Sequence, residues 1–262
     1  MKLSVVLSCD DDVADPAAIV EQARLAEELG FAGVWLPDHP LAPEPYGDVY
    51  GGTYEPLVLL THLASVTEHI TLGTSVVIAP LREPVLLAKQ LATLAQLAPG
   101  RVVFGAGVGW ERREFDSLGV PFVERGARTD AALELIRSVH RGEPHPHGIF
   151  APVPARPVEI MVGGSSAPAL RRAARVADRW QGVGLTPAEF RDRRAELNRL
   201  AAPRRIEAGL MLPRVDYRRP VDELVTTIDA LRDVGCDNVA LHFGDSRYAR
   251  HAMTRLVTAL GW

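Results

Sequence analysis

The chain has few of the features that mark membrane, secreted or nucleic-acid-binding proteins. None of its 262 residues fall in an apolar run approaching the ~18 residues that span a bilayer. The apolar run at the N-terminus is too short for the core of a secretory signal. Its 29 basic and 33 acidic residues leave a net charge of −4, without the basic surplus that nucleic-acid binding usually requires. We therefore expect a cytoplasmic protein that binds small molecules and neither nucleic acid nor membrane.

Two residue types that often carry chemistry are also scarce. Cys9 and Cys236 belong to no CxxC or other ligand-spaced cluster, which argues against a disulfide framework and a zinc site. Cys9 also has no activating histidine beside it. Lys2 precedes the first expected strand and Lys89 lies inside an expected helix, so neither suits a Schiff-base lysine at a strand end. The His-x-His sequence at 145–147 has no third ligand nearby, and we predict no metal site.

Apolar periodicity predicts a regular alternation of strands and helices. The expected strands are Leu3–Ser8, Gly33–Leu36, Ile70–Ile78, Val102–Gly105, Val158–Val162, Trp180–Val183, Ile206–Met211 and Val239–Phe243. The expected helices are Pro16–Leu29, Pro56–Val66, Pro84–Leu97, Gly126–His140, Ala167–Ala177, Pro187–Leu200, Pro220–Val234 and Tyr248–Leu260. Eight such units without a composition break predict an α/β protein with one domain over residues 1–262, a closed (β/α)₈ TIM barrel.

Two long segments, Pro37–Glu55 and Gly109–Arg125, follow the second and fourth expected strands. They would lie at the carboxyl end of the barrel, where barrel enzymes build their active sites. We expect the site at the ends of the first five strands. His39 is a candidate acid or base there, because an imidazole can exchange a proton near neutral pH. Asp38 would fix the tautomer of His39 or hold the loop. A solvent-exposed histidine in an ordinary turn is the alternative.

Glycine-rich turns follow two of the expected strands. Closely spaced glycines at 105–109 would let the backbone approach a ligand. The turn at 163–166 precedes a helix, where free N–H groups and the helix dipole favour an anion such as phosphate. A tight turn that needs two glycines explains the pattern at 163–166 equally well, and the pattern at 105–109 taken alone is a weak signal. The run Thr74-Ser75-Val76, taken alone, is typical of a buried strand.

Five motifs occur together in a fixed order. They are Gly30-Phe31-x-x-Val34-Trp35-x-Pro37-Asp38-His39, Leu72-Gly73-Thr74-Ser75-Val76, Gly100-Arg101-Val102-x-x-Gly105-x-Gly107-x-Gly109-Trp110, Glu114-Phe115 and Val162-Gly163-Gly164. This order resembles the bacterial luciferase-like superfamily of flavin and deazaflavin barrels, closely over residues 1–182 and by rhythm beyond. The Asp-His pair and the Gly-Thr-Ser-Val run resemble the branch that uses the deazaflavin coenzyme F420.

The resemblance implies an F420-dependent oxidoreductase that moves a hydride between the deazaflavin and a small organic substrate. It implies that His39 is catalytic, that Asp38 lies beside the cofactor, and that the peptide bond between Ser75 and Val76 is cis and supports the deazaflavin ring. Backbone groups of the glycine turn would meet the cofactor phosphate. The remaining cofactor-binding candidates are Gly107, Val108, Gly109, Trp110, Gly163, Gly164 and Ser165.

Trp110 stands where sugar-phosphate dehydrogenases of this branch carry a glutamate. The resemblance therefore argues against sugar-phosphate oxidation and leaves His39 as the one strong acid–base candidate. An FMN-dependent monooxygenase and a non-catalytic F420-binding protein are the alternatives. Because the superfamily commonly pairs through the second and third helices, we also expect a homodimer.

Overall fold

The computed structural model describes residues 1–8, 15–42, 52–216, 218–244 and 246–261. Cys9 and the middle of the segment Pro37–Glu55 lie outside the described residues. The strands are β1 (Lys2–Val6), β2 (Gly33–Leu36), β3 (Thr71–Thr74), β4 (Val77–Ile78), β5 (Val102–Gly107), β6 (Glu159–Gly163), β7 (Arg179–Val183), β8 (Glu207–Met211) and β9 (Asn238–His242). All of their pairings are parallel.

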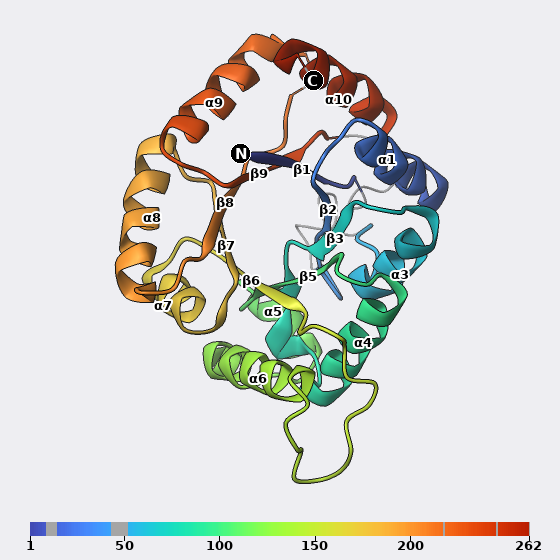
Figure 1. Cartoon of the computed structure of the whole chain (residues 1–262), viewed down its shortest axis with the longest axis vertical. Coiled ribbons are helices and arrows are strands. Elements are labelled where there is room, and N and C mark those ends of the chain that lie inside the picture. The colour runs from blue at the N-terminus through green and yellow to red at the C-terminus, as the bar shows by residue number, and fades with distance from the viewer. Residues whose placement is uncertain (9–14, 43–51, 217, 245, 262) are drawn as a thin grey trace.

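The sheet closes into a barrel because β5 pairs with both β3 and β4, the two halves of one barrel strand. Figure 1 looks down this ring of strands and shows the helices packed around its outside. The helices are α1 (Pro16–Glu28), α3 (Pro56–Val66), α4 (Pro84–Leu97), α5 (Arg112–Ser117), α6 (Arg125–His140), α7 (Ala167–Val176), α8 (Pro187–Ala201), α9 (Val221–Asp233) and α10 (Ser246–Leu260). The expectation of one closed (β/α)₈ barrel is confirmed.

Capping side chains followed by proline explain where several helices begin. The carboxylate of Asp15 accepts a hydrogen bond from the backbone of α1, and Glu55 and Glu83 do the same for α3 and α4. Proline then occupies the first helical turn, where its missing N–H costs nothing. Thr186 and Glu189 form a reciprocal capping box at the start of α8. These signals lie within a few residues of each helix start, so the starts follow from the local sequence.

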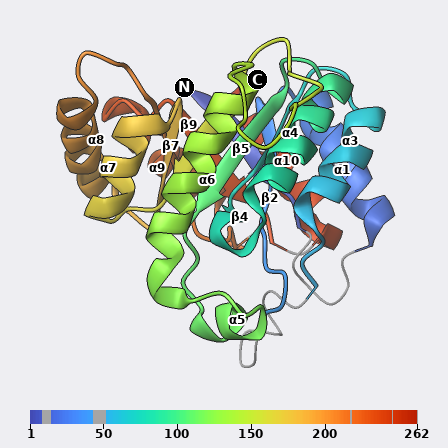
Figure 2. The same cartoon turned by 90° about the horizontal axis from the view of Figure 1, so that it is seen from below.

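The structure differs from the sequence expectation in two places near the barrel mouth. The expected strand Ile70–Ile78 is broken after Thr74, so that β3 and β4 are separate segments. The segment Gly109–Arg125, expected to be a loop, contains the short helix α5, whose first turn is capped by Glu111. Six residues are too few for a helical apolar period to be visible in a sequence. Figure 2 shows α5 at the end of the barrel opposite the chain termini.

Two apolar layers hold the barrel together. The larger one packs the outer faces of the strands against the surrounding helices. The smaller one fills the inside of the barrel and contains Val6, Trp35, Val103, Met161 and Ala240. Val76 and Met211 pack on top of this inner layer. Side chains therefore fill the barrel interior at this level, and the space for a ligand that is described below lies above them, at the carboxyl ends of the strands. Among the described residues, no helix is both long and apolar enough to cross a bilayer.

Candidate active site

A cleft of about 600 Å³ opens at the carboxyl ends of the strands. Its walls come from the ends of β1, β2, β5, β6, β7, β8 and β9 and from the break between β3 and β4. The cleft includes the ends of the first five expected strands, where we expect the site, and extends further to β7, β8 and β9. Most of the predicted site residues line this cleft. They are Asp38, His39, Ser75, Val76, Gly107, Val108, Gly109, Trp110, Gly163 and Gly164.

The break between β3 and β4 forms part of the cleft floor. The peptide bond between Ser75 and Val76 is cis, which confirms the expectation drawn from the family resemblance. The backbone N–H of Ser75 donates to the carbonyl of Leu36 at 2.8 Å. The Ser75 hydroxyl donates to Oε1 of Gln181 at 2.5 Å and lies 3.6 Å from Sδ of Met211. The bulge is thus held from β2 on one side and from β7 and β8 on the other.

Two of the predicted glycines make room for this bulge. A Cβ atom on Gly107 would lie 2.4 Å from one methyl of Val76, and a Cβ atom on Gly163 would lie 2.7 Å from the other. Such distances are far below van der Waals contact, so neither position accommodates a larger residue while Val76 keeps its place. The two glycines therefore leave space for the Val76 side chain. Because they carry no side chains, they also keep the cleft floor low.

The carboxylate of Asp38 is fully engaged by protein groups. It is 4% exposed, and its two oxygens accept from the backbone N–H of Ile78 at 2.9 Å and from Nη2 of Arg82 at 2.7 Å. Arg82 also pairs with Glu55. Burial raises the pKa of Asp38 above its ordinary value, while the Arg82 guanidinium and the Ile78 N–H act in the opposite direction. Asp38 lines the cleft, but its oxygens hold β4 in place.

His39 follows β2 and lies at the edge of the cleft, with its side chain 10% exposed. Its Nδ1 is 3.4 Å from Oε2 of Glu114, a residue of α5 that is 1% exposed. The other oxygen of Glu114 accepts from the backbone N–H of Leu41 at 3.1 Å. The ring of Trp110 packs edge-on against the imidazole, with 5.9 Å between centroids. Glu114 therefore brings a carboxyl group next to His39, in addition to that of Asp38.

The sequence suggested Asp38 as the residue that would fix the tautomer of His39 or hold the loop, whereas the carboxylate next to the imidazole is that of Glu114. The sequence contained the signal, since Glu114 precedes the apolar Phe115 in a segment that follows a barrel strand. The sequence showed no sign of the helix α5. Nothing therefore indicated that the Glu114 side chain turns inward toward His39.

The glycine turn after β6 differs from the expected phosphate site in one respect. The N–H of Gly164 donates to the carbonyl of Gln181 at 3.0 Å, so it is not available to a ligand. The hydroxyl of Ser165 donates to the carbonyl of Val183 and accepts from its N–H, and Ser165 does not line the cleft. Ser166 caps α7. The side chains of this turn therefore stabilise the turn itself.

Several cleft residues escaped the sequence analysis, notably Gln181, Met211, Arg214 and His242. Nδ1 of His242 accepts from the backbone N–H of Gly244 at 3.0 Å, which places the proton of the neutral ring on Nε2. Met211, Arg214 and His242 lie at or near the carboxyl end of an expected strand, so strand position could have indicated them, whereas Gln181 lies inside β7. Within the described residues, no three His, Cys, Asp or Glu side chains are grouped closely enough to bind a metal ion.

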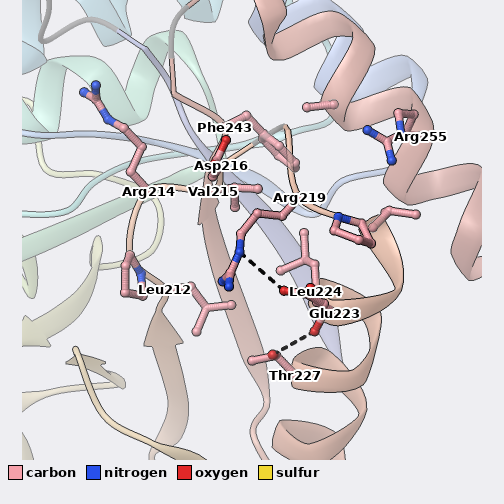
Figure 3. Close-up of a pocket in the computed structure, with 14 residues that line it drawn as sticks. Leu212, Arg214, Val215, Asp216, Arg219, Glu223, Leu224, Thr227, Phe243 and Arg255 are labelled. Carbon is pink, nitrogen blue, oxygen red and sulfur yellow. Dashed lines mark hydrogen bonds and ion pairs between the residues drawn. The ribbon is translucent and has the colours of Figure 1, made fainter.

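A second, smaller cavity of about 240 Å³ lies outside the barrel between the loop after β8 and the helices α9 and α10. Figure 3 shows its charged wall, where Arg219 pairs with Glu223 across 3.4 Å and Arg214 points away from that pair. Leu212, Pro213 and Arg214 line both cavities. The predicted site residues all lie in the larger cleft or next to it.

The chain belongs to the luciferase-like monooxygenase family, whose model matches residues 1–221. An uncharacterised protein of Mycobacterium tuberculosis is 32% identical over 244 residues, which cover 84% of this chain and 83% of that protein. An F420-dependent glucose-6-phosphate dehydrogenase of Kineococcus radiotolerans is 38% identical over 128 residues, 47% of this chain and 37% of that enzyme.

Solved structures with the same fold align with nearly the whole of this chain. An F420-dependent secondary alcohol dehydrogenase, solved with an F420–acetone adduct, has a TM-score of 0.80 at 17% identity and covers 99% of this chain and 98% of its own. A monooxygenase of Streptomyces bottropensis has a TM-score of 0.81 at 19% identity with the same coverage. At such identities the likeness establishes the fold, and the cofactor must be argued from the cleft.

Proposed function

We propose that this protein is an F420-dependent oxidoreductase that transfers a hydride between the deazaflavin and a small organic substrate. The observation that carries the proposal is the pairing of the bulge at Ser75 and Val76, between β3 and β4, with His39 in the wall of the same cleft. The F420-dependent enzymes among the relatives and the structural neighbours support the same assignment.

The cleft fits a planar ring system. Its floor is backbone at the bulge, kept low by Gly107 and Gly163, and its walls include the apolar side chains of Val6, Val108 and Met211. Such a surface excludes water from one face of a bound ring. When bound, F420 would supply the carbon that accepts or gives up the hydride, and the protein would supply orientation and proton transfer.

Phosphate binding falls to the backbone at the start of α7. The N–H of Gly164 already donates to Gln181, so we assign the phosphate contact to Gly163 and to the backbone N–H groups of Ser165 and Ser166. Ser166 caps the start of α7, where the helix dipole favours an anion. Gly109 and Trp110 would border the ring from the β5 side. Trp110 is 51% exposed and fills part of the cleft entrance, which disfavours a sugar phosphate as substrate.

An FMN-dependent monooxygenase is the second candidate, favoured by the family description and by the monooxygenase among the structural neighbours. Steady-state assays separate the candidates. The protein is mixed with F420 and a panel of small alcohols, with reduced F420 and the matching carbonyl compounds, and with reduced FMN under oxygen. Turnover that depends on F420 is expected. Oxygen consumption with reduced FMN, and none of the F420 reactions, would overturn the proposal; F420 binding without any turnover would indicate a binding protein.

We further propose a homodimer that pairs through α3 and α4. α3 carries no charged residue, and Val58 and Leu86 on the two helices are 69% and 57% exposed. Burial of these side chains against a second copy would remove apolar surface from water. Light scattering on the purified protein is expected to give twice the chain mass of 28.5 kDa. A mass of one chain would contradict this.

A further inference from the structure

We propose that Glu114 is a positioning residue for His39, which holds the imidazole in the tautomer with its proton on Nδ1. Nε2 is then the ring nitrogen that can accept a proton. The catalytic consequence rests on the proposed function, whereas the tautomer is a property of the protein alone.

Helix α5 holds the Glu114 carboxyl group in one place. Phe115, the next residue, is fully buried and packs edge-on against Phe122 with 5.1 Å between ring centroids. A Cβ atom on Gly109 would lie 2.7 Å from the Phe115 ring, so the helix sits as close to the end of β5 as a glycine allows. Glu111 caps the first turn. The cap before Glu114 and the packing of Phe115 after it therefore fix the position of Glu114.

The hydrogen bonds of Glu114 determine what it requires of His39. An ionised carboxylate can only accept hydrogen bonds. One oxygen accepts from the N–H of Leu41, a donor that cannot change its role, and the second oxygen faces Nδ1 of His39 at 3.4 Å. Glu114 is 1% exposed, so water does not readily replace a missing donor. The imidazole satisfies the second oxygen only when Nδ1 carries a hydrogen.

This tautomer suits a substrate that gives up a hydroxyl proton. Nε2 without a proton can take the hydroxyl proton of an alcohol while the hydride leaves the adjacent carbon for the cofactor, so that a C=O bond forms and charge balances. The imidazolium formed in that step would face the carboxylate of Glu114, which stabilises it. In the reverse direction the same proton returns to the carbonyl oxygen. An alcohol–carbonyl pair fits this geometry.

If Glu114 only anchors the loop at Leu41, Glu114→Gln should leave the tautomer of His39 unchanged. The positioning role predicts a change. The amide keeps one oxygen, which can still accept from the N–H of Leu41. Its NH₂ group then faces Nδ1 and forces that nitrogen to accept. Glu114→Gln should therefore keep the fold and the loop but move the proton of His39 to Nε2. Asp116→Asn, which removes an exposed carboxylate from the same helix, is the matched control.

Nitrogen-15 NMR of the imidazoles in the cofactor-free protein tests this directly, with His39→Asn identifying the signals of His39. We expect Nδ1 protonated in the wild type and in Asp116→Asn, and Nε2 protonated in Glu114→Gln. A wild-type ring protonated on Nε2 overturns the proposal, even if Glu114→Gln fails to fold. An unchanged tautomer in folded Glu114→Gln also overturns it.

Kinetics add a second readout once a substrate is established. Glu114→Gln should lower kcat by about 10- to 100-fold, part of the ~10²–10⁴ that a positioned acid–base group contributes, with F420 affinity unchanged. Full activity in Glu114→Gln would contradict the positioning role. If no F420-dependent reaction exists, the proposed function fails while the NMR result still decides the tautomer.

Discussion

Ser75 and Gln181 come from barrel strands that have β5 and β6 between them, yet the Ser75 hydroxyl donates to Oε1 of Gln181 at 2.5 Å. Gln181 is 2% exposed, and Ser75 is partly buried in the cleft floor. It ties the cis bulge to the far wall of the cleft. The shape of the cleft floor therefore depends on two residues that are distant in sequence.

A double-mutant cycle measures this dependence. Gln181→Leu leaves the Ser75 hydroxyl without its acceptor and should lower the free energy of unfolding by about 1–3 kcal/mol. Ser75→Ala should have a smaller effect, because its partner amide can relax toward the cleft. The double variant should be more stable than the sum predicts, with a coupling of about 0.5–3 kcal/mol. Urea denaturation of the four proteins gives the coupling, and additive effects would contradict a direct bond.

Gly163→Ala should raise the cleft floor. The added methyl would overlap a methyl of Val76, and relief of that overlap should cost about 1–3 kcal/mol of stability and weaken F420 binding. Gly126→Ala, on α6, is the control, because its Cβ would make only an ordinary contact with Arg172 at 3.6 Å. Denaturation and cofactor titration of both variants test this. Equal behaviour of the two would show that the close approach of Val76 is unimportant.

His39 and Asp38, although adjacent, should respond differently to removal. His39→Ala should lower turnover by ~10²–10⁴-fold with little change in F420 affinity, since its ring lies at the cleft edge. Asp38→Ala leaves Arg82 with one fewer carboxylate and should cost about 3–5 kcal/mol of stability, with weaker F420 binding as β4 loosens. Kinetics and thermal unfolding on both variants separate the roles. Near-normal turnover in His39→Ala would refute its assignment.

His140 should make stability fall on mild acidification. Its Nε2 donates to the carbonyl of Ala88 at 2.9 Å, while its Nδ1 is buried without a partner among the described residues. Burial lowers the pKa of His140 below its ordinary value of 6.5. As the pH falls, the unfolded chain therefore takes up a proton at His140 more readily than the folded protein does. The contribution of the neutral His140 ring to the free energy of unfolding is complete above pH 6.5 and is lost as the pH falls toward the pKa of the folded state.

Urea denaturation at pH 7.5 and 5.5, in wild type and His140→Gln, tests this expectation. The variant keeps an N–H donor but does not titrate in this range, so its stability should change less between the two conditions. An equal loss of stability in both proteins would show that other groups cause the acid sensitivity.

Much of the barrel could be predicted because its signals are local. The bounds of Gly33–Leu36, Pro56–Val66 and Pro84–Leu97 agree with the structure, since a short apolar run or a cap followed by proline defines each of them. The break at Ser75–Val76 could not be derived from its own residues and came from the family resemblance. Its cause is tertiary, in the contacts with Leu36 and Gln181.

The candidate site was predicted only in part for the same reason. His39 was found because it follows a strand in a recognisable motif. Glu114 stood in one of the motifs but was given no role, because a six-residue helix has no visible period. Gln181 and His242 were missed because polar residues within the expected strands were not weighed. The role of Gly164 was misjudged since its N–H is used by a backbone partner that only the folded chain brings near.

Equilibrium titration with oxidised F420 and with FMN, followed by fluorescence quenching, tests the central claim most directly. The wild type, Gly163→Ala and Gly126→Ala are measured under the same conditions. We predict saturable binding of F420 that is tighter than that of FMN, weakened in Gly163→Ala and unchanged in Gly126→Ala. Tighter binding of FMN, or no saturable binding of F420, would contradict the assignment of this cleft to the deazaflavin.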